Sequence, residues 1–109
     1  MRLIALVTMA EAEGEPIEGK RLVIDVILNR IDAPQFPDTA YDVIWERNQF
    51  TCMTNGRVDQ CCVKDDILQL VREEVALRTN SQVIFFTTKN YIGCGTPLFQ
   101  VGAHFFSGL

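Results

Sequence analysis

Residues 3–31 read LIALVTMAEAEGEPIEGKRLVIDVILNRI and contain two helix-forming patterns with a break between them. Apolar residues recur at helical spacing over 3–11 and again over 16–31. Pro16 suits the first turn of the second helix, because its missing N–H would have no partner there. The sequence therefore predicts a helix over 3–11, a short turn, and a second helix over 16–31 that is apolar on most sides and should be mostly buried.

The rest of the chain changes from helical to extended patterns, with Pro or Gly where the elements change. The predicted elements, in chain order, are a short helix over 39–45, a hairpin over 50–58, a helix over 65–78, and extended segments over 83–88 and 98–106 with a loop over 93–97 between them. Helices thus come first and strands last. We expect one α+β domain over residues 1–109 that is mostly α, with a small β hairpin and a β-rich C-terminal end.

Length and charge argue against several classes of protein. The 109 residues are 48% hydrophobic, which suffices for one small packed domain and argues against disorder. The net charge is -4 and the basic residues form no cluster, so no nucleic-acid partner is expected. No stretch approaches the ~18 apolar residues of a membrane span, so no membrane partner is expected. The apolar run over 3–10 is also too short for a signal peptide, which needs ~15 to 30 residues.

The four cysteines, Cys52, Cys61, Cys62 and Cys94, do not have the spacing of a metal site. We expect reduced thiols, no metal and no cofactor. Two alternatives remain open at this point: a Cys52–Cys61 disulfide, and a site in which cysteines and His104 bind a metal. Three roles are open for His104, which is the only histidine: a ligand, a base, or a packed and hydrogen-bonded residue.

Glu11 is the candidate for catalysis. It lies at helical spacing from two apolar residues of the first helix, which places a carboxylate on the apolar side. Burial favours the protonated form of a carboxyl group, and general acid catalysis needs a protonated group. The alternative is a solvated carboxylate at a frayed helix end. Glu13, Glu15 and Glu18 are interpreted as structural, because they precede or begin the second helix, whose dipole favours negative charge there.

Several motifs of the first half follow one another in a familiar order. Residues 11–20, EAEGEPIEGK, are followed by VILNR at 26–30, and then by Phe36-Pro37, Val43-Ile44 and Gln49-Phe50-Thr51. In this order they resemble the cell-wall hydrolases that include the bacterial spore cortex-lytic enzymes. Two positions depart from that pattern: Glu13 stands where Arg is frequent, and the aromatic segment is reduced to Phe85-Phe86-Thr87.

The resemblance implies a lysozyme-like fold and cleavage of the peptidoglycan glycan strand between N-acetylmuramic acid and N-acetylglucosamine. The first Glu of the motif, which is Glu11 here, corresponds to the family's catalytic residue. By motif order, Phe50 is expected to stack on a sugar and Thr51 to form a hydrogen bond to it, and Phe86 and His104 are further expected substrate contacts. The expected protein is therefore a monomeric catalytic domain that has peptidoglycan as its partner and acts on the bacterial cell wall.

The residues leave three alternatives for the reaction. A glycoside hydrolase of the usual kind needs two carboxylates about 5 to 9.5 Å apart, so Asp38 or Asp42 would have to face Glu11. A lytic transglycosylase needs only one Glu, because the C6 hydroxyl of the muramic acid attacks its own anomeric carbon, and this is our main hypothesis. The third alternative is a peptidoglycan-binding or virion module without catalysis. Without a signal peptide, a phage-encoded lysis enzyme and a fragment of a longer protein are both open as origins.

Overall fold

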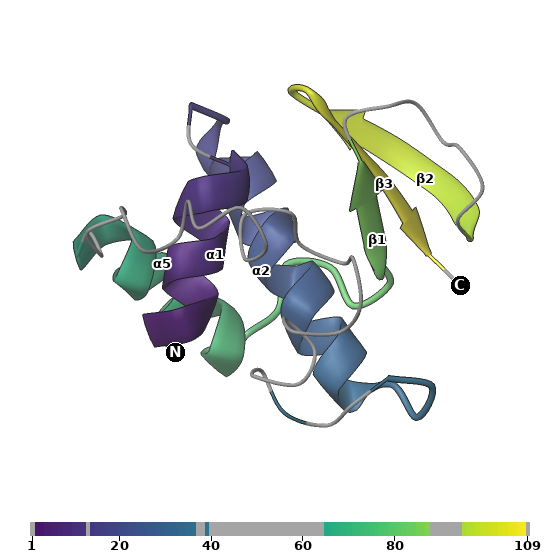
Figure 1. Ribbon diagram of the computed structural model, residues 1–109, viewed down its shortest axis with the longest axis horizontal. Coiled ribbons are helices and arrows are strands. Elements are labelled where there is room, and N and C mark those ends of the chain that lie inside the picture. The colour runs from purple at the N-terminus through teal and green to yellow at the C-terminus, as the bar shows by residue number, and fades with distance from the viewer. Residues whose placement is uncertain (1, 13, 37–38, 40–64, 88–94, 109) are drawn as a thin grey trace.

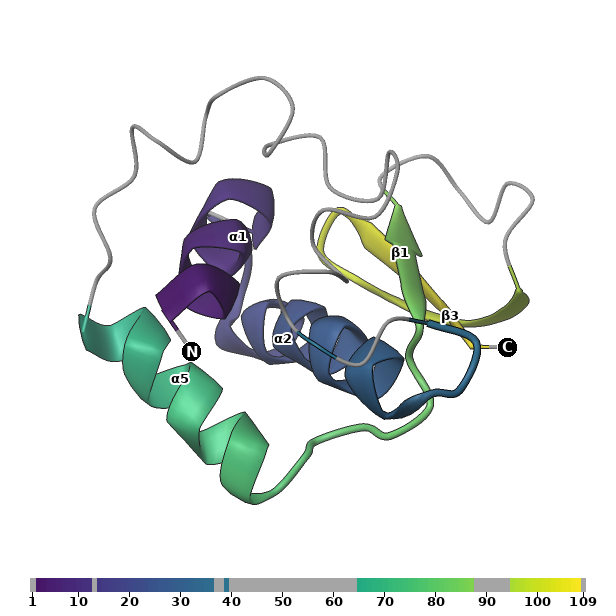
Figure 2. The same ribbon diagram turned by 60° about the horizontal axis from the view of Figure 1, so that its bottom comes forward.

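A computed structural model describes residues 2–12, 14–36, 39, 65–87 and 95–108 of the protein. These residues form the helices α1 (Arg2–Ala12), α2 (Ile17–Asp32) and α5 (Asp65–Ala76) and the strands β1 (Phe85–Thr87), β2 (Thr96–Val101) and β3 (His104–Gly108). In Figures 1 and 2, α2 lies between the other two helices and the three-stranded sheet. Among the described helices, none is long and apolar enough to cross a membrane.

The central helix α2 is buried on two sides, and its residues 22–30 are all buried. On one side Ile24 and Ile27 pack in a cluster with residues of α1 and α5. On the other side Leu22 and Val26 pack in a second cluster with residues of the sheet. Two apolar surfaces on one helix explain why its hydrophobic pattern is wider than a single stripe. Both N-terminal helices are thus confirmed, with ends within one residue of the prediction.

The three strands form an antiparallel sheet in the order β1-β3-β2. In this register Phe106 of β3 lies opposite Phe86 of β1 and Phe99 of β2. Phe106 is fully buried, and its ring centroid is 6.2 Å from that of Phe86 and 5.8 Å from that of Phe99. The central strand therefore supplies the aromatic residue that joins the sheet to α2. These described elements confirm the prediction of an α+β domain that is mostly α with a β-rich C-terminal end.

The C-terminal strands differ from the prediction in two ways. The single extended segment predicted over 98–106 is wrong, because the chain turns at Gly102 and forms two strands. Gly102 has a φ of 59°, a conformation that glycine adopts without strain. The loop predicted over 93–97 is also wrong at its end, since β2 already begins at Thr96. Pro97 is tolerated there because β2 is an edge strand and its register shifts between Pro97 and Phe99.

The predictions for the middle of the chain are tested only where the structure describes it. The predicted helix over 39–45 and the hairpin over 50–58 lie outside the described residues. The helix predicted over 65–78 ends two residues earlier, at Ala76. Just after the helix, Glu74 Oε1 accepts a hydrogen bond from the Thr79 N–H at 2.8 Å, and Arg78 Nη1 donates to Asn29 Oδ1 at 2.9 Å. The Glu74 carboxylate thus satisfies a backbone N–H that another helical turn would have paired.

Polar side chains at the end of α2 hold the segment that leads into β1. Asn29 Nδ2 donates to Asn80 O at 3.0 Å and to Val83 O at 2.8 Å. Arg30 Nε donates to Ile84 O at 2.7 Å. Both side chains are buried, so these bonds satisfy backbone carbonyls that water cannot reach. The Asn-Arg pair of the VILNR motif therefore has a structural role, which is to place the start of β1.

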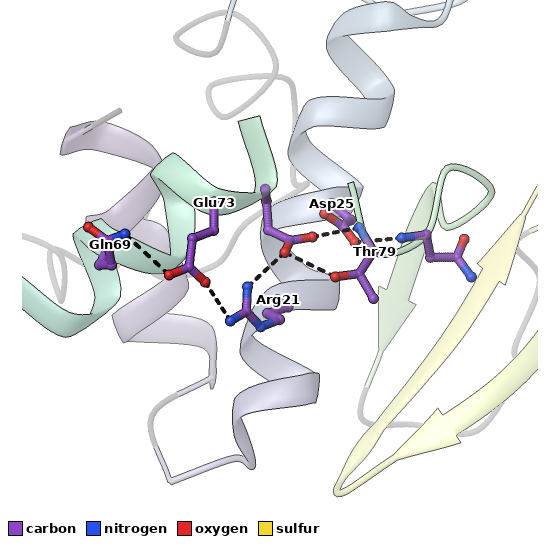
Figure 3. A network of polar contacts seen from close by, with 7 residues as sticks. Arg21, Asp25, Gln69, Glu73 and Thr79 are labelled. Carbon is purple, nitrogen blue, oxygen red and sulfur yellow. Dashed lines mark hydrogen bonds and ion pairs between the residues drawn. The ribbon is translucent and has the colours of Figure 1, made fainter. Parts of the chain in front are cut away.

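A network of charged groups connects α2 to α5 and to the segment after it (Figure 3). Arg21 Nη2 donates to Glu73 Oε1 at 2.6 Å, and Arg21 Nη1 donates to Glu74 Oε2 at 2.9 Å. Thr79 also donates to Glu74 from its N–H and its hydroxyl group. Asp25 Oδ2 accepts the Asn80 N–H at 3.0 Å, and the Asp25 carboxyl also forms a hydrogen bond with Glu74. Two acidic side chains are therefore buried in contact with each other.

This contact has opposite effects on the two acids. Burial, together with the contact with the Glu74 carboxylate, raises the pKa of Asp25 to about 8. Burial opposes ionisation of Glu74 as well, but hydrogen bonds with Asp25, Thr79 and Arg21 outweigh it and hold the Glu74 pKa below its ordinary value. The pair therefore carries one proton near neutral pH, and Asp25 holds it.

We expect the stability of the protein to fall as the pH rises from about 5 to about 8, and the Asp25→Asn variant to lack this part of the fall. The unfolded chain releases the Asp25 proton near its ordinary pKa of 3.8, whereas the folded chain keeps it until about 8. Between these values folding takes up a proton, so rising pH disfavours folding. The lowered Glu74 pKa acts in the opposite direction and removes stability only at acidic pH. Melting temperatures of both proteins across this range are the measurement, and parallel curves would contradict the expectation.

Candidate active site

Glu11 lies in the last turn of α1, where this helix meets the sheet. Its neighbour Ala12 is fully buried in the cluster that contains Phe106, and Phe86 packs against the same cluster. Glu11 itself is half-buried. The predicted catalytic carboxylate is thus at a junction of the two layers, and its catalytic role stays a prediction.

The turn after α1 brings a second glutamate against the sheet. Gly14, with a φ of 85°, allows the chain to reverse, and the Glu15 N–H donates to Ala12 O at 3.0 Å. Glu15 Oε1 then accepts a hydrogen bond from the Ala103 N–H at 2.8 Å. The same oxygen is 3.2 Å from His104 Nδ1, an ion-pair distance at which the ring orientation does not complete a hydrogen bond. Glu15 therefore connects the α1–α2 turn to the turn between β2 and β3.

His104 and Phe86, both predicted as substrate contacts, lie next to each other on paired strands. Their ring centroids are 5.2 Å apart and the rings are nearly perpendicular, at 84°. His104 is only 2% exposed and also packs edge-on against Phe106, with centroids 6.0 Å apart. Phe86 is half-buried. This burial favours the packed interpretation of His104, whereas the ring of Phe86 remains partly accessible to a ligand.

Phe50 and Thr51 lie outside the described residues, as do the four cysteines and the candidate acids Asp38 and Asp42. Their predicted roles stay predictions. Within the described ranges, no group of three or more His, Cys, Asp or Glu side chains is placed to bind a metal ion.

Sequence reasoning missed a cluster of aromatic and basic side chains beside β1. The Arg30 guanidinium carbon is 5.3 Å from the ring centroid of Phe36 and 5.3 Å from that of Phe85. The two rings are 6.1 Å apart and meet edge to face. Such stacking of a guanidinium on aromatic rings is favourable when the groups are shielded from water. Phe36 of the Phe-Pro motif thus packs against Arg30 of the VILNR motif. The order of these two motifs in the chain was the sequence signal for this contact.

Two cavities in the described part of the chain lie away from Glu11. One, of about 580 Å³, is at the C-terminal end of α2 and is lined by residues that include Asp32, Arg78 and Leu98. The other, of about 430 Å³, lies between α2 and β2 and is lined by residues that include Glu18 and Phe99. Glu11, Phe86 and His104 line neither cavity, so the two cavities do not support a catalytic role for these residues.

The sequence profile of the Cell Wall Hydrolase family matches residues 14–107, which is most of the chain. The chain belongs to this family. The match begins three residues after Glu11, so the assignment of that residue depends on the motif itself. The family membership confirms the resemblance that the motifs of the first half indicated.

Relatives in bacteria carry the name spore cortex-lytic enzyme. The protein of that name from Bacillus subtilis is 41% identical over 58 residues, which cover 53% of this chain and 19% of the relative. The one from Oceanobacillus iheyensis is 43% identical over 58 residues, covering 53% of this chain and 21% of the relative. The chain thus matches about a fifth of the length of these curated relatives.

Solved structures show the same fold. The catalytic domain of the germination-specific lytic transglycosylase SleB from Bacillus anthracis superimposes with a TM-score of 0.82 and 23% identity, over 97% of this chain and 91% of that one. The catalytic domain of the Bacillus cereus SleB protein gives a TM-score of 0.84 and 23% identity, over 97% and 87%. The predicted lysozyme-like, mostly helical fold is therefore confirmed.

Proposed function

We propose that this domain cleaves the glycan strand of peptidoglycan between N-acetylmuramic acid and N-acetylglucosamine, as a lytic transglycosylase with Glu11 as its acid and base. The observation that carries the proposal is the position of Glu11, half-buried at the junction of α1 and the sheet in a chain of the cell wall hydrolase family. The names of the relatives and of the solved domains agree with this substrate.

One carboxyl group can carry out both proton transfers of this reaction. Glu11 gives its proton to the glycosidic oxygen as the bond from that oxygen to C1 of the muramic acid breaks. The C6 hydroxyl of the same sugar forms a new bond to C1, and its proton passes to the Glu11 carboxylate. The products are a 1,6-anhydro-muramic end and a free C4 hydroxyl on the glucosamine. No water is consumed, and Glu11 ends in its starting form.

One described acid close to Glu11 in the chain is held by other contacts. Glu15, which lies in the turn between α1 and α2, accepts the Ala103 N–H and faces His104. A carboxylate held in this way is turned toward the β2–β3 turn and does not serve as a second catalytic acid. Phe86 is the described aromatic side chain that we propose as a sugar contact, because it is half-buried beside the same junction.

Product analysis by mass spectrometry tests the proposal. Purified vegetative peptidoglycan and spore cortex are digested with the protein, and the muropeptides are separated. We expect ends that are lighter by one water than hydrolysis products and that resist borohydride reduction. Reducing ends would instead show a two-carboxylate muramidase. If nothing is released but the protein sediments with the glycan, the chain is a binding module and the proposal is wrong.

A further inference from the structure

Glu15 and His104 form a contact between two segments that are far apart in the chain. Glu15 lies in the turn between α1 and α2, and His104 begins β3. The Glu15 side chain is 16% exposed and the His104 side chain 3% exposed, so both are largely removed from water. A carboxylate in such surroundings needs donors, and the Ala103 N–H and His104 Nδ1 are the groups that face it.

The β2–β3 turn is shaped to receive this carboxylate. A Cβ atom on Gly102 would lie 2.6 Å from Glu15 Oε1 and 3.0 Å from its Cδ, so a larger residue would displace the side chain. At Gly19 a Cβ atom would lie in ordinary van der Waals contact, 3.5 Å from Glu15 Cβ and 3.5 Å from Val101 Cγ1, so this position also packs against Glu15. Gly102 therefore lets the β2–β3 turn approach the Glu15 carboxylate closely.

The Glu15–His104 contact is connected to the end of α1 on one side and to Phe86 on the other. On one side, the Glu15 N–H closes the turn on Ala12 O, next to Glu11. On the other side, the His104 ring supports Phe86 edge-on at 5.2 Å. A short chain of packed groups thus links the end of the catalytic helix to the aromatic residue proposed to bind the sugar.

We propose that Glu15 and His104 are positioning residues that set the distance between Glu11 and the strand carrying Phe86. Neither needs to touch the substrate. The inference rests on the proposed function for its effect on catalysis, and on the contacts above for its structural part. General acid transfer requires the acid within hydrogen-bonding reach of the leaving oxygen, and a displacement of about 1 Å costs up to about a hundredfold in rate.

Charge-removing variants separate this role from a general effect of acidic residues near a helix start. Glu15→Gln keeps an oxygen for the Ala103 N–H but removes the charge that faces His104. Glu18→Gln is the matched control, because Glu18 lies in the first turn of α2 and is exposed. We expect Glu15→Gln to lower kcat by about tenfold or more with KM nearly unchanged, since the sugar-binding groups remain. Glu18→Gln should leave both values unchanged, and equal losses in the two variants would overturn the proposal.

Variants of His104 test whether the two residues act as one unit. His104→Phe keeps a ring against Phe86 but removes Nδ1, whereas His104→Asn places an amide near the position of Nδ1. We expect Asn to retain more activity than Phe. The Glu15→Gln/His104→Phe double variant should lose no more than the worse single variant. Additive losses would mean that the residues act independently and would overturn their joint positioning role.

Amide hydrogen exchange decides the structural part even if the wild-type protein cleaves nothing. In Glu15→Gln, exchange should become faster both at residues 10–12 and at residues 102–105, while Glu18→Gln should resemble the wild type. A wild-type protein without cleavage activity would disprove the proposed function alone. Unchanged exchange at either segment in Glu15→Gln would disprove the positioning role alone.

Discussion

Replacing Glu11 by Gln should lower the rate of glycan cleavage by at least about a hundredfold, because the amide cannot transfer a proton. Positioned acid–base groups contribute about 10² to 10⁴ in rate, and one residue carries both transfers here. The shape of the side chain is retained, and Glu11 is half-buried at the end of α1. The melting temperature should therefore stay close to that of the wild type. Release of muropeptides per unit time and thermal unfolding by circular dichroism are the two measurements.

Two comparisons make the Glu11 result specific. Glu18→Gln changes the same atoms at an exposed site on α2 and should retain full activity. Sedimentation with insoluble peptidoglycan should be the same for Glu11→Gln and the wild type, because the variant keeps the sugar-binding surface. If Glu11→Gln cleaves at the wild-type rate, the acid lies elsewhere in the chain and the proposed mechanism is wrong.

The second large effect concerns stability: Glu74→Ala should lower the free energy of unfolding by about 3 to 5 kcal/mol, whereas Glu73→Ala should lower it only slightly. Both glutamates form ion pairs with Arg21, so the comparison holds the partner constant. The Glu74 side chain is 2% exposed and also satisfies Thr79, while the Glu73 side chain is 43% exposed. Loss of the buried acid leaves polar groups without partners inside the protein.

Urea unfolding of the two variants measures this difference. We expect the midpoint to shift strongly for Glu74→Ala and slightly for Glu73→Ala, with similar slopes. Cleavage per folded molecule should remain that of the wild type in both, because the network is separate from the residues placed at the candidate active site. Equal shifts in the two variants would show that burial of Glu74 contributes nothing beyond its charge.

Local pattern was enough to predict several parts of the molecule. Helical spacing of apolar residues placed α1 and α2 within one residue of their ends, because both helices bury long, regular surfaces. The motif beginning at Glu11 indicated the family that the profile match shows. Strand boundaries were less accurate, since the reversal at Gly102 depends on one backbone angle that hydrophobic pattern does not encode.

Contacts between distant residues were not predictable in the same way. Glu15 was interpreted as a charge favoured by the helix dipole, yet its carboxylate binds the Ala103 N–H from a turn far along the chain. His104 had three open roles, and burial beside Phe86 favours the packed one. Asp25 carried no signal in the sequence, because the rise of its pKa comes from burial and from an acid on another helix. Such effects arise only when folding removes water from groups that are separate in the chain.

The amino-acid order alone was therefore sufficient for α1, α2 and the family, because these depend on periodicity and on a continuous motif. Folding was needed to show which acids share a proton, which glutamate faces His104, and where the sheet meets α1. Hydrogen bonds, burial and ring contacts act over a few ångströms, and only the tertiary structure brings residues such as Glu15 and His104 within that range.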